Sequence, residues 1–223
     1  MRSAAPALPS AAPARRPAAP ALPSAAPGLA PVVDHVPTRD RVVFLTYDDD
    51  AERDPGLVEL LRSRRLPVTL FLTDRVAGPA YGRLARLRAV GASIQNHTLD
   101  HSTLRGLPYA GQRAEICGQQ DKLHARFGLR PRLLRPPHGT YDTTTLRAAA
   151  DCGISAVVLW RAAVRPDGTL AYTRGEPRLR PGDIVAVDPD TGATGLPLPD
   201  RTRRLLREIQ GQGLRVGRLE DHI

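Results

Sequence analysis

The chain has 223 residues, which fits one folded domain with a short appendage. Hydrophobic residues make up 41% and charged residues 25%, both near globular averages, so we expect a sizeable core. The formal net charge of +9 would attract nucleic acid, an anionic membrane or an anionic cell-wall polymer, but the basic residues are scattered and the few aromatic residues do not interleave with them, which argues against nucleic acid.

Alanine and proline dominate residues 1–37, and the sequence APALPSAAP at 5–13 recurs at 19–27. Proline favours extended polyproline geometry, so we predict a largely disordered, semi-rigid tether here and a folded domain over residues 38–223. The prolines interrupt every apolar stretch of the tether, so we expect no signal peptide in it and, elsewhere, no transmembrane segment.

From residue 41 onward, short apolar runs alternate with longer amphipathic segments. This pattern is typical of a mostly parallel sheet covered by helices, and several runs are apolar throughout, as buried parallel strands should be. The predicted strands are 42–47, 68–73, 92–96, 133–135, 154–160, 183–188 and 214–219. The predicted helices are 56–65, 81–90, 110–127, 143–152 and 201–210. We therefore predict an α/β fold, a small and incomplete (β/α) barrel with about seven parallel strands.

Capping residues mark the ends of these helices. Asp142 and Asp200 stand where a side chain commonly caps a helix N-terminus. Four glycines stand where a residue in the left-handed conformation commonly ends a helix, namely Gly91, Gly128, Gly153 and Gly211.

The two cysteines, Cys117 and Cys152, are too few for a disulfide scaffold and too widely spaced for a zinc thiolate or redox pair. Each lies on a predicted helix, and a bridge is possible if the two helices are neighbours. One disulfide and two free thiols stay equally open, and so does the redox compartment.

Three consecutive carboxylates, Asp48, Asp49 and Asp50, follow the predicted strand 42–47. They repel one another, so keeping them ionised at the end of a buried strand requires a cation or an arginine. A metal site or a carboxylate with a shifted pKa would explain them. A solvated acidic turn is the alternative.

Two histidines follow the predicted strand 92–96, in the sequence NHTLDH at 96–101. His97 and His101 are four residues apart and would project on one face of a helical turn, so both imidazoles could reach one zinc-like ion at about 2 Å. Two unrelated surface histidines are the alternative.

A stiff loop, RPPHGTY at 135–141, follows the predicted strand 133–135. Its prolines restrict the backbone and Gly139 allows close approach to a ligand, so the loop could aim Arg135 at the carboxylates and a backbone amide at an oxyanion. A merely rigid turn is the alternative. All three motifs nevertheless follow apolar strands, whose carboxyl ends converge on the face of a barrel where active sites lie.

The three motifs, in this order and at these intervals, resemble those of the polysaccharide deacetylase (NodB homology) family of carbohydrate esterases. TYDDD resembles the family motif TFDDG, NHTLDH resembles HTxxH, and RPPHG resembles RPPYG. The resemblance runs from about residue 42 to the C-terminus. It implies a distorted (β/α) barrel and a metal-dependent hydrolase that deacetylates sugar polymers.

The resemblance also implies roles for individual residues. Asp49, His97 and His101 would bind a divalent metal, expected to be zinc, and leave positions for water and the acetyl oxygen. Asp48 would be the general base, oriented and kept ionised by Arg135.

Three residues are expected to contact the substrate. The backbone N–H of His138 would meet the developing oxyanion, and Tyr141 lies on the same loop. Trp160 resembles an aromatic of the family's groove wall, on which an acetyl methyl or sugar face could pack; an ordinary core tryptophan is the alternative.

The chain departs from the family at the residue that protonates the leaving group. Active members usually carry a histidine late in the barrel, in a strand of the type IVLLH, whereas this strand reads IVAVD and ends at Asp188. The aspartate that tunes that histidine has no clear counterpart near Trp160, Asp50 replaces a motif glycine, and His138 replaces the motif tyrosine. A positioned acid contributes about 100- to 10,000-fold in rate. Asp188 with a raised pKa, or His138, could supply the proton.

We therefore expect removal of acetyl groups from an N-acetylglucosamine-containing glycan by metal-activated water, with Asp48, Arg135 and Asp188 as catalytic residues. The alternatives are an O-acetyl esterase of xylan type and a non-catalytic metal- and glycan-binding domain. The expected partner is an acetylated polysaccharide, and the expected state is a monomer outside the cytoplasm, secreted or associated with the cell wall. A tether of this kind suits a position just beyond an export signal, so we hypothesise that the natural start lies upstream.

Overall fold

The computed structural model describes residues 26, 28–49, 51–187 and 195–223. Its strands are β1 (Val32–Val33), β2 (Val42–Tyr47), β3 (Thr69–Leu72), β4 (Ser93–Asn96), β5 (Leu133–Leu134), β6 (Ala156–Val158), β7 (Ala162–Val164), β8 (Leu170–Tyr172), β9 (Ile184–Ala186) and β10 (Arg215–Val216). Its α-helices are α1 (Pro55–Arg64), α2 (Asp74–Ala77), α3 (Tyr81–Ala89), α4 (Tyr109–Phe127), α5 (Thr143–Asp151) and α6 (Leu198–Gly211). Short 3-10 helices lie at η1 (Ala51–Arg53), η2 (Pro137–Gly139) and η3 (Leu219–Asp221).

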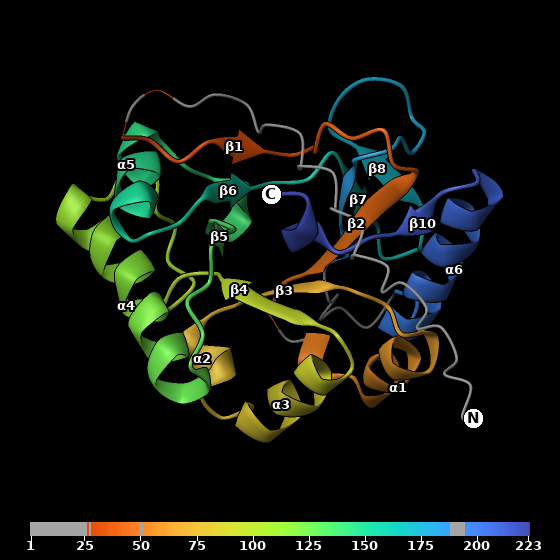
Figure 1. Cartoon of the computed structure of the whole chain (residues 1–223), viewed down its shortest axis with the longest axis horizontal. Helices are drawn as coiled ribbons and strands as arrows, with labels where there is room; N and C mark the ends of the chain where they lie inside the picture. The colour runs from red at the N-terminus through yellow and green to blue at the C-terminus, as the bar shows by residue number, and fades with distance from the viewer. Residues whose placement is uncertain (1–25, 27, 50, 188–194) are drawn as a thin grey trace, which may run out of the picture.

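The strands form one curled sheet with the helices outside it (Figure 1). Its order is β1-β6-β5-β4-β3-β2-β9-β7-β8, and β10 pairs with the first half of β2. Every neighbouring pair except β7 with β8 is parallel. All seven predicted strands are present, and the predicted incomplete α/β barrel is confirmed as a curled half-barrel.

The central strand β2 is apolar along its whole length because both of its faces are covered. Val43 and Leu45 face one core cluster, which includes residues of α1, α3 and α6. Val42 and Phe44 face a second cluster, which fills the inside of the curl and also contains Leu219 near the C-terminus. Burial on both faces explains the unbroken apolar run in the sequence.

The segment around β1 bridges the open side of the curl. β1 pairs with β6, and beyond it His35 forms an antiparallel bridge with Asp183, just before β9. The amide of Val36 donates to the carbonyl of Gly182 at 2.8 Å. A Cβ at Gly182 would lie 1.9 Å from the Val36 oxygen, so only glycine fits there. Part of the segment that we expected in the tether therefore belongs to the sheet, while residues 1–25 lie outside the described residues.

The antiparallel hairpin of β7 and β8 and the short helix α2 were not predicted. Alanines begin β7, and alanine is a poor strand former, so the sequence there carries no strand signal. Helix α2 has a single turn and begins because the Thr73 hydroxyl accepts from the amide of Val76.

The predicted N-cap of α5 is confirmed, because the carboxylate of Asp142 accepts from the amide of Thr145 at 2.9 Å. Three of the predicted glycines do take a positive φ at or just beyond a helix end: Gly91, Gly128 and Gly153. The prediction for the last helix was wrong at both ends. α6 begins at Leu198, so Asp200 lies in its first turn, and Gly211 lies inside the helix while Gly213 takes the left-handed conformation. A proline near the start of α6 favours this earlier beginning.

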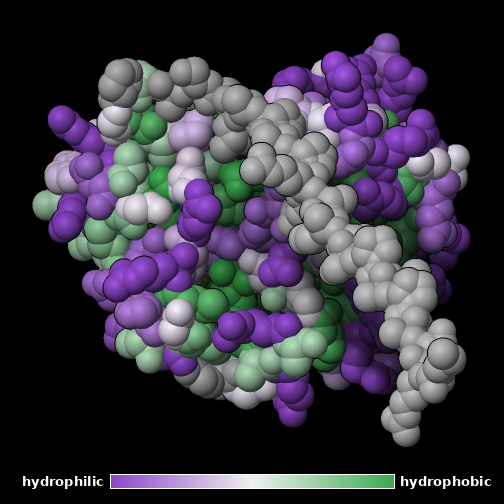
Figure 2. Space-filling model, viewed as in Figure 1, coloured by the Kyte–Doolittle hydropathy of each residue, from purple (hydrophilic) through white to green (hydrophobic). Residues whose placement is uncertain are grey.

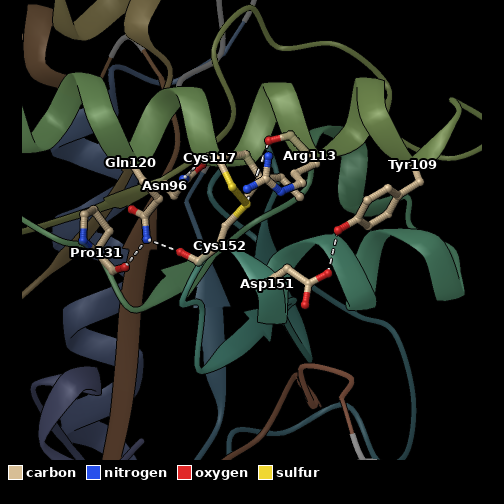
Figure 3. Close-up of a disulfide and its surroundings, with 9 residues drawn as sticks. Asn96, Tyr109, Arg113, Cys117, Gln120, Pro131, Asp151 and Cys152 are labelled. Carbon is tan, nitrogen blue, oxygen red and sulfur yellow. Dashed lines mark hydrogen bonds between the residues drawn. A yellow bond between two sulfur atoms is a disulfide. The ribbon is translucent and has the colours of Figure 1, made fainter.

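Helices α4 and α5 lie side by side and are joined by a disulfide between Cys117 and Cys152 (Figure 3). This excludes two free thiols in the folded chain. On the same pair of helices, the hydroxyl of Tyr109 donates to the carboxylate of Asp151 at 2.6 Å. Among the helices that the structure describes, none has the length and apolar character needed to cross a membrane.

Candidate active site

The residues of the three motifs meet at one rim of the curled sheet. Asp48 and Asp49 follow β2, His97 follows β4, and Arg135 follows β5. Because β2 to β5 are parallel neighbours in the order 2-3-4-5, their carboxyl ends lie at the same edge. The sheet thus places the candidate residues at the position where (β/α) barrels bind substrates.

An ion pair between a buried arginine and a partly buried carboxylate joins two of these motifs. Arg135 has no exposed surface, and its Nη1 donates to Oδ1 of Asp48 at 2.8 Å. Its Nη2 donates to the hydroxyl of Thr46 at 2.7 Å, and the guanidinium lies 4.4 Å from the ring centre of Phe71. A buried charge is tolerated when it is paired and hydrogen-bonded in this way. These contacts hold one oxygen of the Asp48 carboxylate in place.

His97 is buried and presents one nitrogen to the site. Its Nδ1 lies 2.7 Å from the backbone oxygen of Arg135, and because a carbonyl only accepts, Nδ1 carries the hydrogen. Nε2 of the neutral ring is then left with a lone pair. This Nε2 is buried, has no hydrogen-bond partner among the described residues, and lies 3.9 Å from Oδ2 of Asp48.

Asp49 is held beside the histidines by a single residue. The amide of Thr73 donates to Oδ1 at 2.9 Å, and the Thr73 hydroxyl donates to Oδ2 at 2.7 Å. Burial raises the pKa of the Asp49 carboxyl, and the charges of His97 and His101 and the bonds from Thr73 oppose that rise. The Asp49 carboxyl group therefore interacts electrostatically with both imidazoles.

His101 reaches the site through a loop instead of the helical turn that the spacing predicted. Thr98 and His101 both have a positive φ, of 74° and 61°, so this segment is not helical. The ring centres of His97 and His101 lie 4.9 Å apart in an edge-to-face arrangement. Burial and the neighbouring His97 lower the pKa of His101, so its neutral, ligand-competent form is favoured.

The loop that carries His101 is anchored to α4 by Glu115. The amides of Leu99 and Asp100 donate to its Oε2 at 3.1 and 3.2 Å. Glu115 therefore holds the loop that leads to His101. No signal in the sequence indicates this anchor, because Glu115 lies in the middle of a long amphipathic helix.

Two of the three predicted substrate-contacting residues, His138 and Trp160, lie beside this group. His138 is exposed, has a φ of 58°, and its ring centre lies 4.9 Å from that of His101. Trp160 is half-buried, 5.2 Å from the Arg135 guanidinium, and a Cβ added at Gly139 would lie 3.1 Å from the indole. Tyr141 is half-buried on the same loop. Trp160 thus lies next to the Asp48–Arg135 pair.

Two of the candidate carboxylates are not placed. Asp50 and Asp188 both lie outside the residues that the structure describes. The general-acid role suggested for Asp188 therefore stays a prediction.

The side chains fit a divalent cation by donor type, although the described part of the chain contains no preformed cluster of three His, Cys, Asp or Glu ligands. The fit rests on the buried, unpartnered Nε2 of His97, whose Nδ1 is locked by a backbone carbonyl as is usual for metal-binding histidines. Asp49 adds a carboxylate whose oxygens keep a second lone pair beyond their bonds to Thr73. His101 adds a second imidazole.

Thr46 and Thr73 support the site and were not predicted to do so. Thr46 binds the Arg135 guanidinium, and Thr73 binds both oxygens of Asp49. Each residue stands at or just beyond the end of a strand that ends at this rim. That position is the one signal in the sequence that could have indicated them.

Comparisons with known proteins agree with this arrangement. The family model described as polysaccharide deacetylase matches residues 35–157. The chain is 73% identical over 192 residues to an uncharacterized protein of Streptomyces coelicolor, covering 86% of this chain and 77% of that one. It is 27% identical over 153 residues to a chitooligosaccharide deacetylase of Bradyrhizobium, covering 66% and 70%.

Two solved structures show the same fold at low identity. A peptidoglycan N-acetylglucosamine deacetylase matches with a TM-score of 0.72 and 21% identity, covering 85% of this chain and 91% of that one. A pseudoenzyme of carbohydrate esterase family 4 from Bacillus anthracis matches with a TM-score of 0.69 and 18% identity, covering 82% and 65%.

Proposed function

The chain belongs to the polysaccharide deacetylase family, and from this premise we propose that it is a metal-dependent hydrolase that removes acetyl groups from an N-acetylglucosamine-containing glycan. One observation carries the proposal. Oδ1 of Asp48 is bound by the buried Arg135, while Oδ2 of the same carboxylate lies 3.9 Å from the unpartnered Nε2 of His97. A fixed carboxylate beside an available imidazole is the arrangement that a general base next to a metal ligand requires.

Asp49, His97 and His101 would hold the ion, for which zinc is the best match to two imidazoles and one carboxylate. When bound, such a cation supplies Lewis acidity and lowers the pKa of water. Thr73 keeps Asp49 in place, and Glu115 keeps the loop of His101 in place. Three ligands from the protein leave open positions, as in catalytic zinc sites.

Asp48 accepts the proton of the attacking water at Oδ2, the oxygen that Arg135 does not bind. Arg135 neutralises the carboxylate's charge from the buried side, and Thr46 fixes the guanidinium. The backbone N–H of His138 is the proposed donor to the oxyanion that forms at the acetyl carbonyl.

Trp160, His138 and Tyr141 are the proposed substrate contacts. The half-buried indole of Trp160 offers an apolar face beside the Asp48–Arg135 pair, where an acetyl methyl or a sugar face could pack. His138 is exposed next to His101 and lies at the entrance to the site.

We further propose that the domain acts outside the cytoplasm, on a secreted or cell-wall glycan. The disulfide between Cys117 and Cys152 supports this, since such bonds persist mainly in oxidising compartments. One structure of the same fold is a peptidoglycan N-acetylglucosamine deacetylase, and peptidoglycan is a cell-wall glycan.

A second candidate is favoured by one feature of the sequence. Asp188 stands where active family members usually carry the histidine that protonates the leaving group. An ester has a better leaving group than an amide, so this replacement favours an O-acetyl esterase over an N-deacetylase; a domain that only binds metal and glycan is the extreme case.

Acetate release decides among these functions. The protein is stripped with a chelator, reloaded with zinc or another divalent metal, and assayed in parallel on N-acetylglucosamine oligomers and acetylated xylan. Release from the amide substrate, dependent on added metal, supports N-deacetylation, and release from xylan alone supports the esterase. Binding of zinc and oligosaccharide without any acetate release under every metal contradicts a hydrolase.

A further inference from the structure

The rim opposite the candidate active site carries several arginines. Arg41 and Arg132 directly precede β2 and β5, Arg215 begins β10, and three more lie within five residues of the start of β3, β4 and β9, namely Arg65, Arg88 and Arg180. Because these strands run parallel, their amino ends gather at the rim away from Asp48 and Asp49. These six arginines therefore lie towards one end of the fold.

A half-open cavity of about 440 Å³ lies in this rim, where β2, β9 and β10 begin. Its basic lining consists of Arg41, Arg178 and Arg180, and its apolar lining includes Leu179 and Leu214. None of the described residues that line it is aromatic. The volume suits one or two sugar units, since pockets of about 300 to 1,000 Å³ hold small ligands.

The loop that supplies two of these arginines is held rigid by a buried ion pair. Arg161 donates to both carboxylate oxygens of Asp183, each at 2.5 Å, and both side chains are buried. The same guanidinium donates to the backbone oxygens of Arg174, Glu176 and Arg178. This loop follows β8 at the top right of Figure 1, and Figure 2 shows hydrophilic side chains gathered at that corner. The backbone of the loop is thus fixed before any ligand binds.

The third arginine of the cavity is fixed in a similar way. Arg41 donates from Nε to the backbone oxygen of Gly213 at 2.8 Å and from Nη2 to that of Gln212 at 2.9 Å. These carbonyls carry no net charge, so the guanidinium keeps its full positive charge at the cavity wall.

Positive charge exceeds negative charge around the cavity. The carboxylate of Glu176 lies 2.8 Å from Arg178 and 3.3 Å from Arg180, so one carboxylate is shared by two guanidinium groups. The Nε of Arg180 is buried and has no hydrogen-bond partner among the residues that the structure covers. With Arg41, three cations face one anion, which leaves a net attraction for a further oxyanion.

We propose that this cavity binds the anionic group of an acidic glycopolymer, a carboxylate or phosphate ester on a saccharide chain. Arginine binds such oxyanions in a bidentate manner, and the apolar wall at Leu179 and Leu214 suits the face of a sugar ring. A nucleic acid is a poorer fit, because the described cavity lining offers no aromatic ring on which a base could stack. The cavity lies at the other end of the strands from Asp48, so binding here can be tested separately from the proposed hydrolysis.

The test uses two variants with the same loss of charge. Arg178→Gln/Arg180→Gln removes two cations from the cavity, and the control Arg113→Gln/Arg147→Gln removes two exposed arginines from α4 and α5. Arg41→Gln is a second cavity variant on a different element. Each protein is titrated calorimetrically with oligogalacturonate, poly(glycerol phosphate), neutral chitotriose and a short single-stranded DNA, after thermal melting has shown that it is folded.

We expect the cavity variants to lose about tenfold in affinity for one of the two anionic polymers and the control to lose less than about twofold. Comparing the titrations with oligogalacturonate and poly(glycerol phosphate) shows whether the cavity binds a carboxylate or a phosphate. Neutral chitotriose should bind equally to all variants. An equal loss in the cavity and control variants, or tighter binding of the DNA with the same dependence on Arg178 and Arg180, would overturn the proposal. Acetate release is measured separately. The binding result can therefore be interpreted even if the protein releases no acetate.

Discussion

Arg135, a side chain with no exposed surface, donates to Asp48 at 2.8 Å across an interval of 87 residues in the sequence. The same residue accepts from His97 through its backbone oxygen at 2.7 Å. One residue therefore sets the position of both the proposed general base and a proposed metal ligand. Changes at these contacts should alter activity, metal binding and stability to different extents.

Asp48→Asn should lower acetate release by about 100- to 10,000-fold, because an amide cannot accept the proton of water. Zinc affinity, measured by calorimetry, should change little, since Asp48 is not among the proposed ligands. Asp100→Asn is the matched control, because Asp100 is exposed on the loop between the two histidines. Wild-type activity of Asp48→Asn would remove Asp48 from the mechanism.

Arg135→Met should destabilise the protein by up to about 3 kcal/mol, because it removes the cation that pairs with the partly buried Asp48 carboxylate. Arg135→Lys keeps the charge but cannot bind Asp48 and Thr46 together, so it should recover part of the stability and little of the activity. Unfolding in urea and acetate release measure the two effects. If Arg135→Lys is as active as the wild type, the fixed geometry of the guanidinium is not needed.

Asp188→Asn should reduce acetate release from N-acetylglucosamine oligomers more than from acetylated xylan, because amine expulsion requires a proton and ester cleavage depends on it less. His138→Phe is tested in parallel, since His138 is the other residue that could supply the proton. If neither change lowers the rate on the amide, neither residue is the general acid.

Stability should depend on pH through Asp142. Bonds from the amides of Gly106 and Thr145 lower the pKa of this carboxyl to about 2, below its unfolded value near 3.9. A lowered folded pKa stabilises the protein fully above roughly pH 5, and this contribution is lost as the pH falls towards 2. Asp142→Ala should therefore cost about 1 kcal/mol at neutral pH and less near pH 2, measured by urea unfolding. A difference that is constant with pH would show that the carboxylate's charge is not involved.

Removing the disulfide with Cys117→Ser/Cys152→Ser should lower the free energy of unfolding by about 2 to 4 kcal/mol, since the bridge closes a loop of 35 residues between α4 and α5. A reducing agent should lower the melting temperature of the wild type by a similar extent and leave the variant unchanged. If the wild type melts at the same temperature with and without reductant, the bond contributes nothing to stability.

The segment around β1 is a part of the fold that a local sequence pattern could not predict. This strand has only two residues and lies in a proline-rich segment, so no periodic pattern in the sequence indicates it. It forms because β6 offers an open edge and because Gly182, far along the chain, lets Val36 approach. Both conditions belong to distant residues, and a local pattern cannot contain them.

The sequence by itself determined the parallel strands and the types of residue that come directly after them. Continuous apolar runs such as Val42–Tyr47 are local signals of burial on both faces, and parallel strands bring the residues at their carboxyl ends to one rim. These positions made the carboxylates after β2 and the histidines His97 and His101 candidates, and the resemblance to the family then named Asp49, His97 and His101 as the metal ligands.

Only the tertiary structure decided how those side chains are held. The bonds from Thr73 to Asp49, from the loop of His101 to Glu115, and from Arg161 to Asp183 each depend on where distant elements pack. The arginine rim arises in the same way, since the amino ends of strands gather only when the sheet forms. Hydrogen bonds and charge pairs between distant residues depend on how the elements pack. They produce no periodic pattern in the sequence, so they could not be predicted from it.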